Sequence, residues 1–413
     1  MHRRRGLLPL LAAPLLAATI PAAMIPAAAS TPVDVAAADN AFGFRLLNAV
    51  QKTVPKGNVI LSPVSAALNL SMVLNGADGV TKREMLSALS LHSSELDAIN
   101  TANADLIKKI RSPARDVTLS VADSLWVDSR RATLRPDYLK RVQASYAAEL
   151  ADLDFSSPAT TARINGWVSK ETQGKIPKVI DTIDPTELLF LVNAVYFKGQ
   201  WTHKFDPAKT QQRDFTLDGG TIRQVARMAQ SGRFEYFETP EIQGIRLPFG
   251  DGALVMEILL PAKSSSLGAL EEQLSPQTWK DWRTHYAHRP GTIELPRFEL
   301  KSRYKLNAPL QRLGMKRAFQ PGAAELTGLL SSGSGPTHTG QLSISSVLQS
   351  TYWKVDEEGS EAAAVTTTGV RATAIARPEE PFHMIVDRPF FCAIQDQRSG
   401  ALLFIGAIYD PES

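Results

Sequence analysis

The stretch from 357 to 377 reads Glu357-Glu358-Gly359-Ser360-Glu361-Ala362-Ala363-Ala364, followed by VTTTGVRATAIAR. Its residues alternate as those of a β-strand do. One set of alternate positions is compact and uncharged, and it comprises Ser360, Ala362, Ala364, Thr366, Thr368 and Val370. The other set holds Glu361 and Arg371, the only charges between Ser360 and Ile375. Small residues such as these are typical of an exposed loop. Because alternate residues of a strand face opposite sides of a sheet, the same stretch also suits a strand with one buried face. The pattern predicts a conformational switch.

The segments around this stretch predict an α+β fold. The uncharged run AALNLSMVLNGA at 66–77 predicts a helix that is buried all round. The run ELLFLVNAVYFKGQW at 187–201 predicts a central strand that is covered on both faces. Helical patterns dominate before residue 172 and strand patterns after residue 186, and no linker or repeat divides the chain. We therefore expect one domain over residues 30–413.

The N-terminal residues 1–29 have the pattern of a secretory signal peptide. Three arginines at positions 3–5 precede an apolar run from Leu7 to Ile20, and the alanine-rich segment that follows permits cleavage after Ala29, or alternatively after Ala23. The sequence thus predicts a secreted protein, extracellular or periplasmic, with no membrane partner. Removal of the three arginines from the 45 basic residues leaves 42, against 42 acidic ones. The net charge of zero argues against nucleic acid as a partner.

The composition excludes several other classes. Of the 413 residues 44% are hydrophobic, which excludes a disordered chain, and the single cysteine, Cys392, excludes an intramolecular disulfide and CxxC-type metal sites. No GxSxG, HExxH, Walker or GxGxxG motif occurs. His285 and His288 form an HxxH pair in a segment expected to be helical, but they lack a third ligand. We expect no enzyme, no metal and no cofactor.

Seven segments resemble those of the serpin family, in the family's order and spacing. Residues 357–364 resemble the hinge EEGTEAAA, residues 58–65 (NVILSPVS) resemble NxxxSPxS, and residues 193–201 (NAVYFKGQW) resemble NAxYFKGxW. The other matches are Asn75 to Thr81, Leu247 to Phe249 with Leu295 to Phe298, Asp387 to Phe390, and Leu403 to Gly406. On these motifs the chain is identified as a secreted, inhibitory-type serpin of bacterial origin.

The resemblance implies three β-sheets, eight to nine helices and an exposed reactive-centre loop at about 357–377. In the family, a target serine protease attacks this loop and forms an acyl-enzyme. The cleaved loop then enters the main sheet as an extra strand and distorts the trapped protease. A buried charge would slow that entry, and the compact hinge from Ser360 to Ala364 carries none on its inward face.

The family's spacing from the hinge glycine places the cleaved bond between Thr373 and Ala374. Its small neighbours suit an elastase-like or subtilisin-like target. The rival bond, Arg371-Ala372, would suit a trypsin-like protease. The alternative function is that of a non-inhibitory serpin acting as a carrier, chaperone or storage protein.

The resemblance also assigns mechanical roles. Ser62, Ser65 and Asn193 match the shutter beneath the main sheet, and Gln349 stands where the family usually has a histidine. Since an amide does not titrate, sheet opening is expected to be less sensitive to pH near 6–7. Trp201 matches the breach at the top of the sheet, and Glu357 with Arg297 resembles the hinge ion pair.

A short basic cluster is the remaining candidate for a binding site. Lys108, Lys109, Arg111 and Arg115 lie near the helix that binds heparin in some serpins. The run is short and the mature chain is neutral, so we interpret the cluster as a solvated helix face and expect no polyanion partner. We expect a monomer whose partner is the target protease.

Overall fold

The computed structural model describes residues 33–93, 95–112, 114–184, 186–332, 342–359 and 379–412. Nine α-helices lie in these ranges: α1 (Val35–Gln51), α2 (Pro63–Leu74), α3 (Gly79–Ala88), α4 (Leu96–Arg111), α5 (Pro136–Tyr146), α6 (Pro158–Glu171), α7 (Leu267–Gln273), α8 (Pro276–Arg283) and α9 (Asn307–Arg312). Two short 3₁₀ turns, η1 (Pro207–Lys209) and η2 (Arg317–Phe319), accompany them. Among the described residues, no helix is long and apolar enough to cross a membrane.

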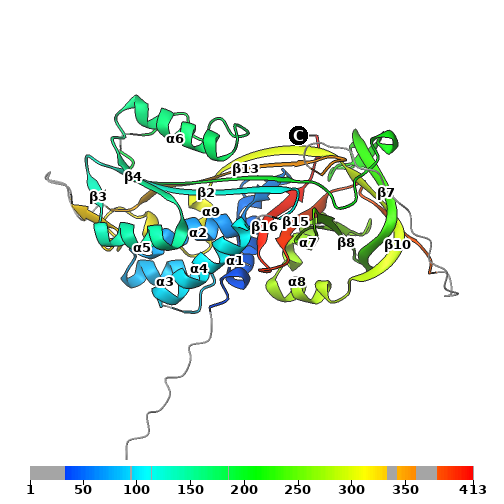
Figure 1. The fold of residues 1–413 in the computed structure, drawn as a ribbon, viewed down its shortest axis with the longest axis horizontal. Helices are drawn as coiled ribbons and strands as arrows, with labels where there is room; N and C mark the ends of the chain where they lie inside the picture. The colour runs from blue at the N-terminus through cyan, green and yellow to red at the C-terminus, as the bar shows by residue number, and fades with distance from the viewer. Residues whose placement is uncertain are drawn as a thin grey trace, which may run out of the picture. The chain divides into compact units, whose positions relative to one another are not determined.

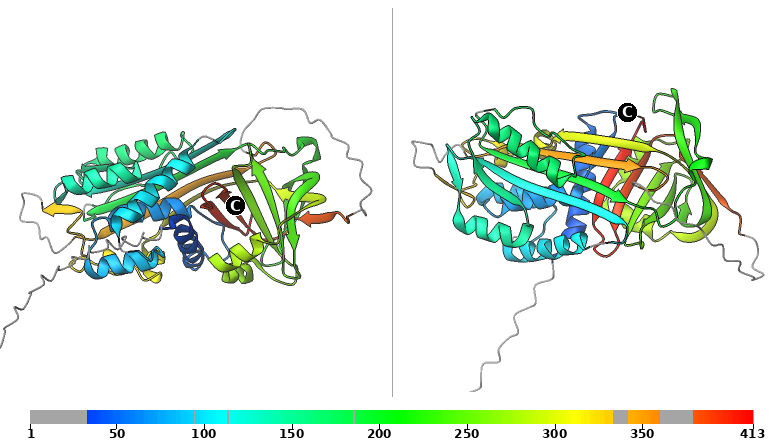
Figure 2. Two further views of the ribbon diagram at one scale, coloured as in Figure 1. Left: turned by 60° about the horizontal axis from the view of Figure 1, so that its bottom comes forward. Right: turned by 45° about the horizontal axis from the view of Figure 1, so that its top comes forward.

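A five-stranded sheet runs through the fold. Its order is β11 (Phe298–Lys305), β13 (Ile344–Val355), β5 (Leu189–Gly199), β2 (Val117–Asp128) and β4 (Glu149–Leu153). The central pair β13 and β5 is parallel, and β5 is antiparallel to β2. Figure 1 shows α6 over one face of this sheet and α2 beneath the other, and Figure 2 shows its strands side by side with α6 crossing them.

A second, nine-stranded sheet is built largely from the C-terminal half of the chain. Its order is β1 (Val59–Leu61), β16 (Leu402–Ile408), β15 (Phe390–Asp396), β9 (Leu254–Pro261), β8 (Ile242–Phe249), β7 (Ile222–Glu238), β10 (Ala287–Pro296) and β14 (Phe382–Ile385), with β6 (Gln211–Thr216) paired to β7. A third sheet pairs β12 (Leu330–Ser332) with β3 (Ala132–Leu134). The expected α+β fold, with three sheets and eight to nine helices, is confirmed.

The two-sided burial of β5 follows from its alternating side chains. Leu191 and Val195 join the large core cluster that includes α2, whereas Val192 and Tyr196 join a second cluster with residues of α6. Every residue of α2 is buried, and Pro63 at its first turn costs no hydrogen bond because that backbone position has no helical partner. Both sequence predictions about these elements are confirmed.

The expected helix around His285 and His288 is wrong. Helix α8 ends at Arg283, and Thr284 caps it by donating its hydroxyl to the Asp281 carbonyl at 2.6 Å. His288 instead lies on β10, which pairs with β7. In the described ranges, no group of three or more His, Cys, Asp or Glu side chains is arranged to hold a metal ion.

Candidate functional site: the hinge and the seam of the central sheet

A tight turn follows β13 at the start of the predicted loop. Asp356 and Gly359 form an antiparallel bridge, and the Gly359 N–H donates to the Asp356 carbonyl at 3.1 Å. Gly359 has φ of +103°, and a Cβ added to it would lie 2.4 Å from the Gly199 carbonyl oxygen. Both the left-handed backbone and the close approach therefore require glycine here.

Backbone hydrogen bonds hold this turn against the segment that follows β5. The Trp201 N–H donates to the Glu358 carbonyl at 3.0 Å, and the indole Nε1 donates to the Asp356 carbonyl at 2.8 Å. The Phe205 N–H donates to the Glu357 carbonyl at 3.0 Å. The Trp201 ring stacks on Phe249 with 4.3 Å between centroids. The turn is thus anchored beside Trp201 at the end of β5.

The Glu357 side chain is buried and paired. Only 4% of the residue is exposed, and its Oε1 accepts from Arg297 Nε at 2.6 Å. Thr210 Oγ1 donates to the same oxygen, and Arg297 Nη2 also contacts it. Glu358 forms an ion pair with Lys204. Two cations from distant parts of the chain, Arg297 and Lys204, therefore neutralise the two hinge carboxylates.

Lower in the sheet, three polar side chains form a row across three adjacent strands. Asp123 on β2 pairs in register with Asn193 on β5, which pairs in register with Gln349 on β13. Asn193 Nδ2 donates to Asp123 Oδ1 at 2.6 Å, and Gln349 Nε2 donates to Asn193 Oδ1 at 2.7 Å. All three side chains are buried.

Helix α2 closes this row from below. The Ser62 N–H donates to Gln349 Oε1 and the Ser62 carbonyl accepts from Gln349 Nε2, both at 3.0 Å. Ser65 Oγ accepts from Asn193 Nδ2 and donates to Asp123 Oδ1 at 3.3 Å. Asn69 Nδ2 also reaches Asp123, at 3.4 Å. A hydrogen-bonded cluster therefore ties α2 to β2, β5 and β13.

The boundary between β5 and β13, called the seam below, is closed. Leu189 to Tyr196 of β5 pair directly with Ile344 to Tyr352 of β13. Gln349 bonds to Asn193 across this boundary, and a strand entering between β5 and β13 would have to break that bond. The sheet is therefore in its five-stranded state.

Residues 37–411 match the family model described as serpin (serine protease inhibitor). The chain belongs to the serpin family. Leukocyte elastase inhibitor of the pig, Sus scrofa, is 34% identical over 394 residues, which cover 91% of this chain and 99% of the relative. A serpin-like protein of Thermococcus kodakarensis is 33% identical over 381 residues, covering 92% and 86%. The native structure of tengpin, a thermophilic serpin, superposes with a TM-score of 0.81 at 28% identity, covering 91% of this chain and 94% of tengpin.

The structure of this serpin brings many of the predicted site residues together. Ser62, Ser65, Asn193 and Gln349 share one cluster, and Trp201, Glu357, Glu358, Gly359 and Arg297 share the hinge. The hinge residues Ser360, Glu361, Ala362, Ala363 and Ala364 lie outside the described residues. So do both candidate bonds, Thr373-Ala374 and Arg371-Ala372, and the signal peptide at 1–29.

Sequence reasoning missed Asp123, the titratable member of the shutter. Burial raises the pKa of this carboxyl to about 7, against the opposing effect of hydrogen bonds from Asn193 and Asn69 and of the Arg111 charge. The expectation of weak pH sensitivity rested on Gln349 being unable to titrate. It stays a prediction about Gln349 alone, because Asp123, two strands away on β2, is a further titratable group of the same cluster. The sequence feature that could have revealed Asp123 is a single Asp in the otherwise uncharged stretch VTLSVADSLWV.

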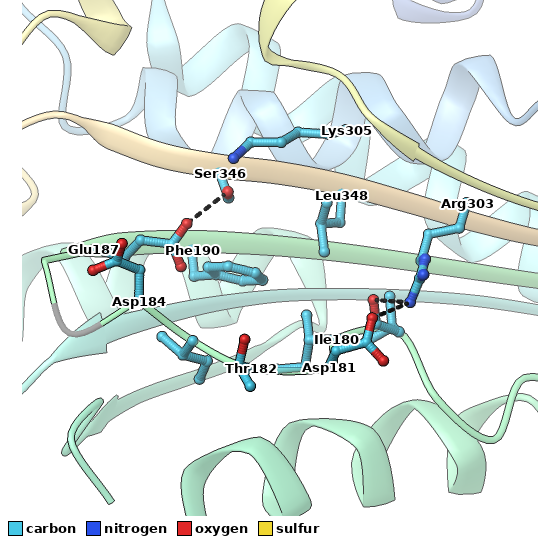
Figure 3. A pocket seen from close by; sticks show the side chains of 12 residues that line it. Ile180, Asp181, Thr182, Asp184, Glu187, Phe190, Arg303, Lys305, Ser346 and Leu348 are labelled. Carbon is cyan, nitrogen blue, oxygen red and sulfur yellow. Dashed lines mark hydrogen bonds and ion pairs between the residues drawn. The ribbon is translucent and has the colours of Figure 1, made fainter. Parts of the chain in front are cut away.

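A pocket of about 760 Å³ opens over the lower end of the seam (Figure 3). Phe190 of β5 and Leu348 of β13 line it from the two sides of the seam. Asp181, Asp184 and Glu187, from the segment between α6 and β5, face Arg303 and Lys305 of β11. The three carboxylates exceed the two cations by one.

Proposed function

We propose that this chain is a secreted suicide-type inhibitor of serine proteases. A protease cleaves the reactive-centre loop, becomes trapped as an acyl-enzyme, and is displaced when the loop enters the seam between β5 and β13. The observation that carries this proposal is the closed five-stranded sheet with the hinge turn anchored at its upper end. The alternating compact residues of the loop support it further.

The hinge geometry supplies the means of starting insertion. Glu357 to Gly359 turn back beside the end of β5. We propose that the residues after Gly359 continue from this turn into the seam when the loop inserts. The hinge bonds hold the turn in place while the loop moves. Entry then requires loss of the Gln349–Asn193 bond, which we propose acts as the latch of the seam.

The proposed target is an elastase-like or subtilisin-like protease, with cleavage at Thr373-Ala374. The pig relative is named leukocyte elastase inhibitor, which agrees with a target that accepts small residues. Cleavage at Arg371-Ala372 by a trypsin-like protease is the rival. The proposal includes residues 1–29 as a signal peptide, 30–413 as a single domain of bacterial origin, and action as a monomer.

The test is incubation of the mature protein with elastase, subtilisin and trypsin, followed by denaturing gels and mass spectrometry of the released peptide. A stable one-to-one adduct with a peptide starting at Ala374 supports the proposed bond. An adduct with trypsin and a peptide starting at Ala372 keeps the mechanism and moves the bond. Cleavage without an adduct by all three proteases, together with an unchanged thermal midpoint, would refute the mechanism and favour a carrier, chaperone or storage role.

A further inference from the structure

The hinge turn sets a register for the loop as an inserted strand. The antiparallel bridge between Asp356 and Gly359 is the first pair of a hairpin whose other arm is β13. In an antiparallel hairpin, residues pair one for one away from the turn. Continued from this bridge, Ser360 comes opposite Val355, Glu361 opposite Lys354, and Thr366 opposite Gln349.

This register places the compact loop residues on the core face of the sheet and the charged ones on the face covered by α6. Directly opposite residues in a ladder point to the same side of the sheet. Val355, Trp353 and Val347 belong to the large core cluster, so the compact set that begins with Ser360 would enter that core. Tyr352 and Leu348 belong to the cluster beneath α6, so Glu361 and Arg371 would face that side.

At the upper end, Glu361 would meet positive charge. Tyr352 of β13 pairs with Tyr196 of β5, and two residues farther along each strand stand Lys354 and Lys198. A strand entering the seam in this register places Glu361 between these two lysines. Lys354 already pairs with Asp356 at 2.9 Å, so Glu361 would join that ion pair and face Lys198.

At the lower end, the same register carries Arg371 to the pocket over the seam. Arg371 follows Glu361 by ten residues and Gly369 by two, so it lies on the same face as Gly369, whose ladder partners Ser346 and Phe190 line the pocket. It comes past the bulge between Ile344 and Ser346, level with Leu188 on the side of β5. Glu187 stands two residues before Leu189 and lines the pocket. Gly369, which would come opposite Ser346, has no side chain to obstruct the approach.

Two of the three pocket carboxylates, Asp184 and Glu187, form no ion pair among the described residues, but Asp184 accepts two hydrogen bonds from Thr186. Arg303 Nη1 is paired with Asp181 at 3.6 Å, whereas Glu187 accepts only a neutral hydrogen bond from Ser346 Oγ, at 3.0 Å (Figure 3). Lys305 is the nearby cation, yet burial still raises the pKa of Glu187. A planar guanidinium suits such a carboxylate because it donates two parallel hydrogen bonds.

We propose that this pocket is the receptor for the Arg371 guanidinium of the inserted loop, with Glu187 as its main partner. The inference rests on the proposed insertion. It assigns the pocket a role in the inserted state alone: the ion pair forms at the last step of insertion and retains the distal end of the new strand.

The test is a double-mutant cycle on the full-length mature chain, with wild type, Glu187→Gln, Arg371→Gln and the double variant. Gln at 187 still accepts the Ser346 hydrogen bond, so the local structure is preserved. Each protein is cleaved with subtilisin, and mass spectrometry verifies that every cut lies beyond residue 371. Thermal unfolding is then measured before and after cleavage. Glu272→Gln, an exposed carboxylate on α7, is the matched control.

We expect cleavage to raise the wild-type midpoint, and each single substitution to lower the cleaved midpoint by about 1–3 °C. The cleaved midpoint of the double variant is no lower than that of the less stable single variant. Arg371→Gln leaves the intact midpoint unchanged, and 1 M salt shrinks the effect. If Arg371→Gln lowers the cleaved midpoint by the same amount in the wild type and in the Glu187→Gln variant, the pocket assignment is overturned while insertion stands. If cleavage raises no midpoint at all, the assignment and the proposed function fail together.

Discussion

Asp123 and Asn193 are joined across the ladder of β2 and β5, where Asn193 Nδ2 donates to Asp123 Oδ1 at 2.6 Å. The same amide accepts from Gln349 through its oxygen. Because one amide serves both neighbours, the charge on Asp123 bears on the bond that closes the seam. An ionisable group is thereby connected to the mechanical latch.

Stability is expected to fall as the pH rises from about 4 to about 7, through Asp123. Its pKa is raised in the folded state, so between these values the native protein keeps a proton that the unfolded chain has released. The contribution is fully present below the ordinary pKa of 3.8 and is lost above about 7. Asp123→Asn should therefore stabilise the protein at pH 8, by up to a few kcal/mol, and change little at pH 4. Denaturant unfolding across this range measures the difference.

Asp39 provides the control for that experiment. It is a buried carboxyl on α1 whose pKa burial also raises, but it is outside the shutter. Asp39→Asn should also reduce the fall in the free energy of unfolding as the pH rises. Only Asp123→Asn should alter the pH dependence of the rate at which the cleaved loop inserts. An identical effect of the two variants on that rate would contradict a role of Asp123 in the latch.

Removal of the Gln349 amide should loosen the seam. Gln349→Leu deletes two bonds to Ser62 and one to Asn193, which we expect to cost about 1–3 kcal/mol of native stability. The intact protein should convert faster to inserted or polymeric forms on mild heating, as native gels would record. Ser350→Ala is the matched control, since in the described structure the buried Ser350 Oγ has no hydrogen-bond partner. Equal conversion rates for both variants would argue against the latch.

Gly359→Ala should destabilise the intact and the cleaved protein to a similar extent. The added Cβ meets the Gly199 carbonyl oxygen, and the backbone has positive φ, for a cost of about 1–3 kcal/mol. The proposed insertion keeps this turn as the start of the hairpin, so the cost remains after cleavage. Gly166→Ala on α6, where a Cβ meets nothing within 4 Å, should be neutral or slightly stabilising. A loss of stability in intact Gly359→Ala that disappears after cleavage would contradict this account of the turn.

Ala364→Arg should convert the inhibitor into a substrate. Ala364 belongs to the compact set of the loop, and a charge buried beneath the sheet costs several kcal/mol, which slows insertion relative to hydrolysis of the acyl-enzyme. Gel assays should show cleaved protein in place of the covalent adduct, whereas Ala364→Thr, which remains compact, should keep the adduct. A full-strength adduct with Ala364→Arg would count against inward burial of this position.

Local periodicity was sufficient to predict two central elements. The buried helix α2 and the doubly covered strand β5 were evident because their patterns have periods of 3.6 and 2 within a dozen residues. The extent of the helix near His288 was mispredicted, because pairing of β10 with β7 decides the structure there and local pattern does not. The hinge and shutter residues came from family resemblance rather than from periodicity.

By itself, the sequence determined the alternating pattern of the 357–377 stretch and the placement of its two charges, since both are properties of neighbouring residues. Only the tertiary structure decided that Asp123, Asn193 and Gln349 form one row, because strand register joins residues that are 70 and 156 positions apart. The same register placed Glu187 beside the seam and buried Asp123, and burial shifts a pKa only once the surrounding strands and helix have excluded water.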